Sequence, residues 1–130
     1  MIEIRHLLDA VTCHDSDSVL IVSRILRDTQ TRHAVVIDEH KKPIGIVSAV
    51  DITNRVVAAG KDAAKTFARD IMTSPIATMD INASYDDAYR AMVNAGIYAI
   101  PVTKQGALIG LLDFNCLFGK CKELSHEKHS

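Results

Sequence analysis

The chain has 130 residues and carries 15 basic against 16 acidic side chains, which gives a formal net charge of −1. This length is enough for one domain with a real core, and the balanced charge argues against polymeric nucleic acid as a partner because no basic stripe is available. No apolar run reaches the ~18 residues that span a bilayer, and acidic residues follow the first methionine too soon for a secretory signal. We therefore expect a cytoplasmic protein that has no membrane partner.

The first predicted elements are a helix, a hairpin and a second helix. Ser18 is placed to begin the first helix, whose apolar residues recur at helical spacing. These residues are Val19, Val22, Ile25 and Leu26. Two β-rich segments follow, at about 34–38 and 43–48, and the polar turn between them is of hairpin length. The second helix is predicted to begin at Ser48, which can form a capping box with Asp51.

A connector and another helix come next. Residues 61–75 are helix-prone and end in a break at Pro75, a pattern typical of a connector. The following helix is predicted to begin at Ser84, which can form a capping box with Asp87, and to stop at Gly96. Its apolar face consists of Tyr85, Ala88, Tyr89, Met92 and Val93.

The hairpin signal then returns. Two β-rich segments, at about 98–103 and 107–112, are separated by a short polar turn, and Asp113 is placed to begin a helix. The elements after the connector therefore repeat, in the same order, those before it.

Sliding the chain on itself confirms an internal repeat at the level of residues. A shift of 65 positions lays residues 34–47 over 99–112 without a gap, whereas the residues upstream need a shift of 66. The first copy therefore carries one extra residue, which we expect in the loop before its central strand. Two copies of one supersecondary unit, each too small to bury its own apolar face, are expected to pack on each other.

The repeat sets the predicted domain organisation. We expect repeat 1 at residues 1–60, a helical connector and the start of the second repeat at 61–75, repeat 2 at 76–119, and a polar tail at 120–130. The chain is thus interpreted as a tandem pair and not as two independent domains.

The repeated motifs are similar to those of a known family. The segment DIMTSPIATMDINASYDDAYRAMVNAGIYAIPVTKQGALIGLLDF closely resembles the cystathionine-β-synthase (CBS) domain, and residues about 5–58 resemble a second copy. The matching features are the Met-Thr-x-Pro start, a Thr and a Ser ahead of the helix, a hydrophobic-Pro-Val strand, and a Gly-containing strand that leads into a Ser/Thr-x-x-Asp position. The resemblance covers nearly the whole chain.

This resemblance implies an α+β fold in which two β-α-β-β-α repeats pack with pseudo-two-fold symmetry and commonly form homodimers. It also implies a regulatory function and no enzymatic activity. Members of the family typically bind an adenosine-containing ligand, such as AMP, ADP, ATP or S-adenosylmethionine, in clefts between the repeats, and pass its presence to an effector protein. No other cofactor is implied.

The resemblance assigns one cleft to the start of the helix after residue 48. Ser48 and Asp51 occupy the family's Ser/Thr and Asp positions, and the carboxylate can accept the two ribose hydroxyls. Ile46 is expected on the apolar wall around adenine. The opposite wall is expected from the second copy, where Tyr98 stands at a position that often carries a cation for the phosphate. The residues of this wall are Thr78, Tyr98, Ala99 and Pro101.

The second cleft departs from the family pattern. Its Ser/Thr position is Asp113 and its Asp position is Cys116, so a negative charge stands where phosphate would lie and the ribose acceptor is missing. Its opposite wall is expected to contain Thr12 and the cationic pair Arg32 and His33. We therefore expect one working cleft, at Asp51.

Each of these residues also has a purely structural interpretation. Ser48 and Asp51 can serve only as a helix cap, Arg32 and His33 can be a solvated start of a strand, and Asp113 can cap the last helix. The helix after Asp113 has no acid where Asp51 stands, so starting a helix at this place does not require that carboxylate. A ligand role for Asp51 therefore remains open beside the structural one.

Two other functions stay open. The pair could be a ligand-free scaffold for dimerisation or interaction with another protein. The second is a module that responds to a metal or to redox state through its C-terminal tail, where cysteine and histidine residues of the kind that bind zinc lie close together in the sequence. The residues concerned are Cys116, Cys121, His126 and His129. Their spacing matches no closed structural zinc site, and no catalytic arrangement of Ser, His and Asp or of Cys and His is present, so we assign neither metal ligands nor catalytic residues.

Overall fold

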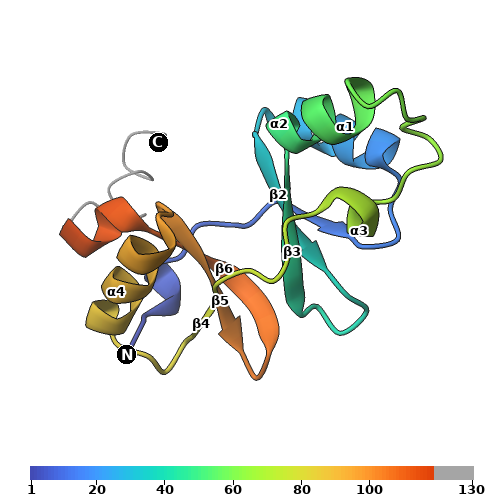
Figure 1. Ribbon diagram of the computed structural model, residues 1–130. Coiled ribbons are helices and arrows are strands. Elements are labelled where there is room, and N and C mark those ends of the chain that lie inside the picture. The colour runs from blue at the N-terminus through green and yellow to red at the C-terminus, as the bar shows by residue number, and fades with distance from the viewer. Residues whose placement is uncertain (119–130) are drawn as a thin grey trace. The chain divides into compact units, whose positions relative to one another are not determined.

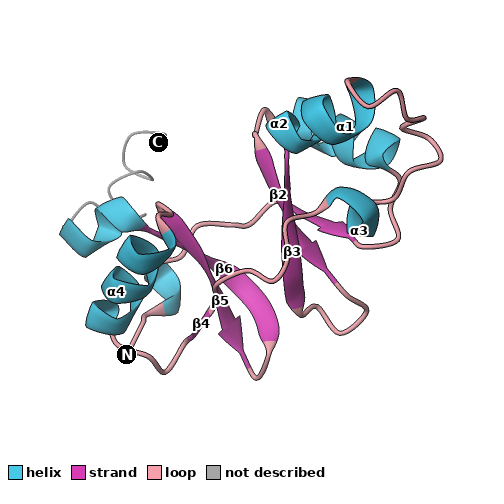
Figure 2. Ribbon diagram, viewed as in Figure 1, coloured by secondary structure: helices cyan, strands magenta, loops and turns pink. Residues whose placement is uncertain are grey.

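The computed structural model describes residues 1–118 and divides them between two compact units. Unit 2 is the continuous segment Val11–Ile76, and unit 1 combines Met1–Ala10 with the chain from Ala77 onward. Each unit contains one three-stranded sheet and its own helices (Figures 1 and 2). The predicted α+β class is therefore confirmed.

Unit 2 is built on the sheet order β1-β2-β3, with β1 (Thr12–His14) parallel to β2 (His33–Ile37) and β2 antiparallel to β3 (Pro43–Ser48). Between β1 and β2 lies α1 (Val19–Thr29), as expected for a parallel connection. After β3 the chain forms α2 (Ala49–Ile52), which continues as the π-helical turn η2 (Thr53–Val57), and later α3 (Ala68–Ile71).

Unit 1 repeats this order. Its sheet is β4-β5-β6, with β4 (Met79–Asp80) parallel to β5 (Ala99–Lys104) and β5 antiparallel to β6 (Ala107–Asp113). The connecting helix is α4 (Tyr85–Ala95), and the 3-10 helix η3 (Phe114–Phe118) follows β6. A further 3-10 turn, η1 (Ile4–His6), comes from the N-terminal segment.

The apolar stripe of the connecting helix forms the core of each unit. In unit 2 the buried residues of α1 pack with those of β2 and β3: Val19, Val22, Leu26, Ala34, Val36 and Val47. In unit 1 the corresponding set from α4, β5 and β6 is Ala88, Met92, Ile100, Val102 and Leu112. Apolar burial of this kind supplies about 25 cal/mol per Å² and is the main stabilising contribution to both units.

The predicted helix starts are confirmed. The hydroxyl of Ser18 accepts the backbone N–H of Ile21 at 3.2 Å, and that of Ser84 accepts the N–H of Asp87 at 3.0 Å. Gly96 ends α4 in the left-handed conformation, at φ 66°. The helix α1 ends in the same conformation at Gln30, a residue type that gave no stop signal in the sequence.

The extra residue of the first repeat lies in its hairpin turn, not before its central strand. Val36 pairs with Gly45 and Val102 pairs with Gly110, and a bulge follows both Val36 and Val102. Strand β2 is therefore related to β5 by 66 positions, like the elements before it, and the shift falls to 65 only beyond the turn. As a result Arg32 is the counterpart of Tyr98.

The segments that precede the two repeats are exchanged between the units. Leu8 forms an antiparallel bridge with Leu111 of unit 1, and Thr73 forms one with Ile46 of unit 2. Both bridges carry two backbone hydrogen bonds of 2.8–3.0 Å. Residues 61–75, which were expected to be a connector, belong to unit 2.

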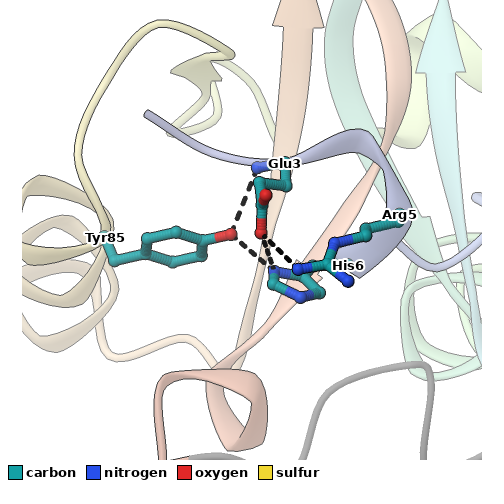
Figure 3. Close-up of polar contacts among 4 residues, drawn as sticks. All are labelled: Glu3, Arg5, His6 and Tyr85. Atoms are coloured by element: carbon teal, nitrogen blue, oxygen red, sulfur yellow. Dashed lines mark hydrogen bonds and ion pairs between the residues drawn. The ribbon is translucent and has the colours of Figure 1, made fainter.

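The N-terminal segment is also fastened to α4 by side chains. The Tyr85 hydroxyl accepts the backbone N–H of Glu3 at 3.1 Å and lies 2.6 Å from Nδ1 of His6 (Figure 3). The Glu3 carboxylate lies 3.2 Å from the Arg5 guanidinium and 3.5 Å from Nδ1 of His6. The two contacts of Tyr85 join residues that are 82 and 79 positions apart in the sequence, so they hold the N-terminal segment in a defined place on unit 1.

Candidate functional site

The predicted capping box at the end of β3 is present in unit 2. The backbone N–H of Ser48 donates to Oδ2 of Asp51 at 2.9 Å, and the N–H of Asp51 donates to the Ser48 hydroxyl at 3.0 Å. Burial alternates along β3, so Ile46 and Ser48 lie on the opposite face of the sheet from the core residue Val47. The structural interpretation of Ser48 and Asp51 is therefore correct, and it leaves room for a second role.

The carboxylate of Asp51 retains unused acceptor capacity. Its side chain is 17 % exposed, and Oδ1 lies 3.9 Å from Nε of Arg55, one helical turn further on. A carboxylate offers about four lone-pair positions, of which the helix cap occupies one. Oδ1 can therefore accept further hydrogen bonds from a ligand.

Arg55 is a cation that the sequence analysis did not single out. Its Nη1 donates to the backbone carbonyl of Ile71 at 2.7 Å while its Nε faces Asp51. The spacing of four residues between an acid and a base on a helix was the available signal. The guanidinium remains about half exposed, so it places positive charge beside the candidate carboxylate.

Arg32 and His33 lie at the same end of the same sheet as Ser48. His33 pairs with Ser48 across β2 and β3, and the backbone N–H of Ala49 donates to the carbonyl of Arg32 at 2.9 Å. Both side chains are exposed. The backbones of this cationic pair and of Ser48 are thus neighbours within unit 2, whereas the assignment of the pair to a different cleft from Asp51 stays a prediction.

Thr12 lies on the other edge of this sheet. It is the first residue of β1 and pairs with Val35, which in turn pairs with Ile46 of β3. Thr12 and Ile46 are both half-buried. One end of the unit 2 sheet thus brings together Arg32, His33, Ser48 and Asp51, with Ile46 and Thr12 further along the strands.

The corresponding end of unit 1 has different chemistry. Ala99 pairs with Asp113, and the backbone N–H of Phe114 donates to the carbonyl of Tyr98 at 2.7 Å. Tyr98 is 78 % exposed and contacts the Phe114 ring edge to face. Asp113 accepts the N–H of Asn115 at 3.2 Å and precedes η3, whose described residues are 3-10 helical.

Two other predicted site residues of unit 1, Thr78 and Pro101, differ in exposure. Thr78 is exposed in the loop just before β4. Pro101 is fully buried in β5, where it pairs with Leu111. Of the unit 1 residues assigned to the site, Tyr98, Ala99 and Asp113 are therefore grouped at one sheet end, and Thr78 and Pro101 are not part of that group.

Residues 1–118 contain no group of three or more His, Cys, Asp or Glu side chains that could hold a metal ion. Cys116 is buried in unit 1. The other residues of the metal or redox hypothesis, Cys121, His126 and His129, lie outside the described part of the chain. No helix within residues 1–118 is long and apolar enough to cross a membrane.

Comparison with known proteins gives two matches to one family. Residues 3–58 and 68–118 each match the CBS domain. The solved structures that resemble the chain include Hypoxic Response Protein I with two coordinated zinc ions, at a TM-score of 0.78 and 18 % identity over 92 % of this chain and 98 % of that one. They also include a CBS domain designated NE2398 (TM-score 0.71, 24 % identity, 92 % and 97 % covered).

A hexameric CBS-CP12 protein from bloom-forming cyanobacteria is a further structural relative, with a TM-score of 0.70 and 21 % identity over 96 % of this chain and 73 % of that one. By sequence, an uncharacterized protein of Methanopyrus kandleri is 30 % identical over 80 % of this chain and 54 % of its own length. An uncharacterized protein of Methanocaldococcus jannaschii is 30 % identical over 80 % of this chain and 28 % of its own length. The chain thus spans about half or less of these two relatives.

Proposed function

The chain belongs to the CBS-domain family as a tandem pair of repeats, and from this premise we propose that it is a regulatory module that binds an adenosine-containing ligand at the Arg32–Ser48–Asp51 end of unit 2. The ligand class is AMP, ADP, ATP or S-adenosylmethionine, and the bound state is passed to an effector protein. CBS-domain pairs of this kind are typically regulatory and not catalytic.

The observation that carries this proposal is the presence of a cation and an available carboxylate at one sheet end. Arg32 is exposed next to His33, which pairs with Ser48 across β2 and β3, and a guanidinium at this sheet end supports pairing with a phosphate. The Oδ1 atom of Asp51, 3.9 Å from Nε of Arg55, keeps acceptor capacity that ribose hydroxyls could use, and the half-buried Ile46 could contact the base. In unit 1 the counterparts of Arg32 and Ser48 are Tyr98 and Asp113, so the same set is absent from its described residues.

A thermal-shift panel with AMP, ADP, ATP, NAD and S-adenosylmethionine tests the proposal. A ligand that binds only the folded state raises the melting temperature by mass action. Asp51→Asn keeps a side-chain oxygen for the helix cap but loses the charge, so this variant should fold and lose the ligand-dependent rise. Arg32→Gln should weaken the response to nucleotides that carry phosphate.

The matched control is Asp87→Asn. Asp87 forms the equivalent capping box with Ser84 at the start of α4, where its Oδ2 accepts the Ser84 N–H at 3.4 Å. This variant changes a helix cap of the same kind far along the chain from the candidate site, and it should keep the full ligand response. The absence of any rise with all five compounds would overturn the proposal.

A second candidate function is a ligand-independent interaction scaffold, and an exposed aromatic surface on unit 1 favours it. We call this surface, formed by Tyr89, Val93, Tyr98, Phe114 and Phe118, the aromatic surface. Tyr89 stacks on Phe114 at 5.8 Å between ring centroids, and Phe118 is 63 % exposed. Exposed apolar groups of this extent mark interaction sites more often than ordinary surface.

The corresponding positions of unit 2 do not repeat the aromatic surface; they are Ser23, Arg27, Arg32, Ala49 and Thr53. The scaffold function predicts self-association through unit 1 that is independent of ligand. Light scattering should then report a dimer that becomes a monomer in a Tyr89→Ser/Phe118→Ser double variant, with or without nucleotide. An unchanged mass in this variant would remove the support for the scaffold.

A further inference from the structure

Unit 1 contains a cavity at the opposite end of its sheet from Tyr98 and Asp113. Its volume is about 720 Å³, within the range of small-molecule sites. Lys104, the last residue of β5, and Gln105 in the turn after it line the cavity together with Asp80–Asn82 and the N-terminal segment. Because Ala99 pairs with Asp113 at one end of the hairpin and Lys104 pairs with Ala107 at the other, this cavity is separate from the sheet end discussed above.

The floor of the cavity is apolar and fixed. Ile2 and Ile81 are 1 % and 5 % exposed, and both belong to the core of unit 1. The backbone N–H of Ile2 donates to the carbonyls of Ile81 and Ala83, each at 3.1 Å. Ile4 adds an exposed apolar side chain at the cavity wall.

The N-terminal wall of the cavity is held by the side-chain contacts of Figure 3. The hydroxyl of Tyr85, on α4, accepts the backbone N–H of Glu3 and contacts His6. The Glu3 carboxylate pairs with the Arg5 guanidinium at 3.2 Å. Glu3 and Arg5 line the cavity and neutralise one another. The wall therefore does not need a ligand to order it.

Among the charged side chains that line the cavity, Asp80 and Lys104 have no ion-pair partner within residues 1–118. Asp80 of β4 pairs with Thr103 of β5. Lys104 is the next residue of β5, so Asp80 and Lys104 lie on neighbouring strands, one register position apart. Oδ1 of Asp80 accepts the Asn82 N–H at 2.8 Å, which leaves its second oxygen available. Apart from the Glu3–Arg5 pair, the cavity thus offers one carboxylate and one ammonium side chain above an apolar floor.

The equivalent cavity of unit 2 shows that this chemistry is particular to unit 1. That cavity is about 300 Å³ and is lined by His14, Asp15, Ser16, Asp38 and Glu39. Each of these residues lies 66 positions before a residue of the unit 1 cavity, the shift that relates the two sheets up to the hairpin turn. In unit 2 an aspartate stands in place of Lys104 and another in place of Ile81, so the cation and the apolar floor are both absent from it.

From these observations we infer that the unit 1 cavity binds a small zwitterion with an apolar side chain, the class of apolar α-amino acids. Lys104 pairs with the carboxylate, Asp80 pairs with the ammonium group, and the side chain lies on Ile2, Ile4 and Ile81. A ligand with a single charge would meet one opposite and one like charge, so it binds more weakly than the zwitterion. This site is independent of the nucleotide site proposed in unit 2.

A titration of the full-length protein followed by two-dimensional amide NMR tests this inference, with L-leucine as the probe. L-leucine should shift the amide signals of residues 2–5, 80–82 and 104–105. The single-charge analogues 4-methylpentanoate and 3-methylbutylamine should bind at least about tenfold more weakly, since a hydrogen bond to a charged group contributes on that scale.

Variants of the two charges complete the test. Lys104→Met and Asp80→Asn should each raise the dissociation constant for L-leucine about tenfold or more. Asp80→Asn keeps an oxygen for the Asn82 N–H, and the dispersion of the amide spectrum confirms that each variant is folded. The matched controls Lys42→Met and Glu39→Gln remove charges from the hairpin turn of unit 2 and should leave the titration unchanged.

Three results would overturn the inference. The first is the absence of any amide shift in the wild-type protein, and the second is equal affinity for L-leucine and either single-charge analogue. The third is that Lys104→Met and Asp80→Asn both fold and bind L-leucine with the same dissociation constant as the wild-type protein.

Discussion

Leu8 and Leu111 are joined by a reciprocal pair of backbone hydrogen bonds, 2.8 Å from the N–H of Leu8 and 2.9 Å from the N–H of Leu111. Thr73 and Ile46 form the same pair in unit 2: Thr73 lies 65 positions after Leu8, and Ile46 lies 65 positions before Leu111. Each sheet therefore gains a short edge segment from chain that precedes the other repeat. This segment covers backbone groups that an edge strand would otherwise expose.

Gly110, which faces Leu7 and Leu8 of the edge segment, should be needed for the stability of unit 1. A Cβ at Gly110 would lie 2.9 Å from both the Leu8 carbonyl oxygen and Leu7 Cβ, and neither atom can move without the backbone. We expect Gly110→Ala to lower the free energy of unfolding by about 1–3 kcal/mol through overpacking. Chemical denaturation followed by circular dichroism measures this change.

The matched variant is Gly45→Ala. Its Cβ would approach Met72 Sδ to 2.6 Å and the Thr73 carbonyl oxygen to 3.0 Å. The nearest atom belongs to a flexible side chain that can turn away, so the loss of stability should be smaller than for Gly110→Ala. A larger loss for Gly45→Ala would contradict the described packing of the edge segments.

The hydroxyl of Tyr85 should stabilise unit 1 by fastening the N-terminal segment. Tyr85→Phe removes the acceptor of the Glu3 N–H and the contact with His6 but keeps the ring. We expect the free energy of unfolding to fall by about 1 kcal/mol, the usual contribution of a hydrogen bond. Tyr89→Phe, which alters an exposed hydroxyl on the same helix, is the control, and an equal effect of both variants would contradict the prediction.

The buried thiol of Cys13 should make stability fall in alkaline solution. Burial, together with Asp17 and Asp15, raises the pKa of this thiol from 9.0 to about 12. Between these two values the unfolded chain has released the proton that the folded chain still binds, so the free energy of unfolding falls as the pH rises. One proton corresponds to about 1.4 kcal/mol per pH unit at the steepest point.

The comparison that isolates this effect is Cys13→Ala. Other groups titrate in the same range, but they are common to both proteins, so the stability difference between the wild type and the variant should shrink from pH 9 toward pH 12. Urea denaturation at several pH values measures it. A difference that stays constant over this range would show that the thiol does not remain protonated in the folded state.

Asp38 should organise the hairpin turn of unit 2. Its Oδ1 accepts the backbone N–H groups of His40 at 2.8 Å and Lys42 at 3.0 Å. These bonds, with that from Lys42 the larger cause, lower the pKa of the carboxyl group. The contribution to stability is therefore present above the ordinary value of 3.8 and is lost as the pH falls through the lower, folded-state pKa.

The variant that tests this is Asp38→Ala, with Glu39→Ala as its control in the same turn. Amide hydrogen exchange of residues 38–42 should become faster in Asp38→Ala and stay unchanged in Glu39→Ala. Equal exchange rates in wild type and Asp38→Ala would contradict the role assigned to the carboxylate.

The sequence was sufficient to predict the elements that depend on local chemistry. Ser18 and Ser84 mark helix starts because a hydroxyl at this position satisfies a free amide group. The strand pairs of both hairpins followed from their β-rich segments and short turns. The stop at Gln30 was not predictable in the same way, since the left-handed conformation there is imposed by the fold and not by the residue type.

Features that depend on distant contacts were placed less well. The identity of Ala34 and Ala99 suggested a gap-free alignment of the strands, whereas the backbone pairing of Val36 and Val102 shows that the extra residue lies in the turn. That one-position difference hid the correspondence of Arg32 with Tyr98.

The exchange of edge segments has a consequence for how such a chain can arise by duplication. A single copy of the repeat would carry one edge segment and one sheet, but in this chain each edge segment pairs with the sheet of the other copy. Such a chain could complete its fold only in reciprocal exchange with a second molecule. Joining two copies in tandem turns that intermolecular exchange into an intramolecular one, so the inherited unit of sequence and the unit of folding do not coincide.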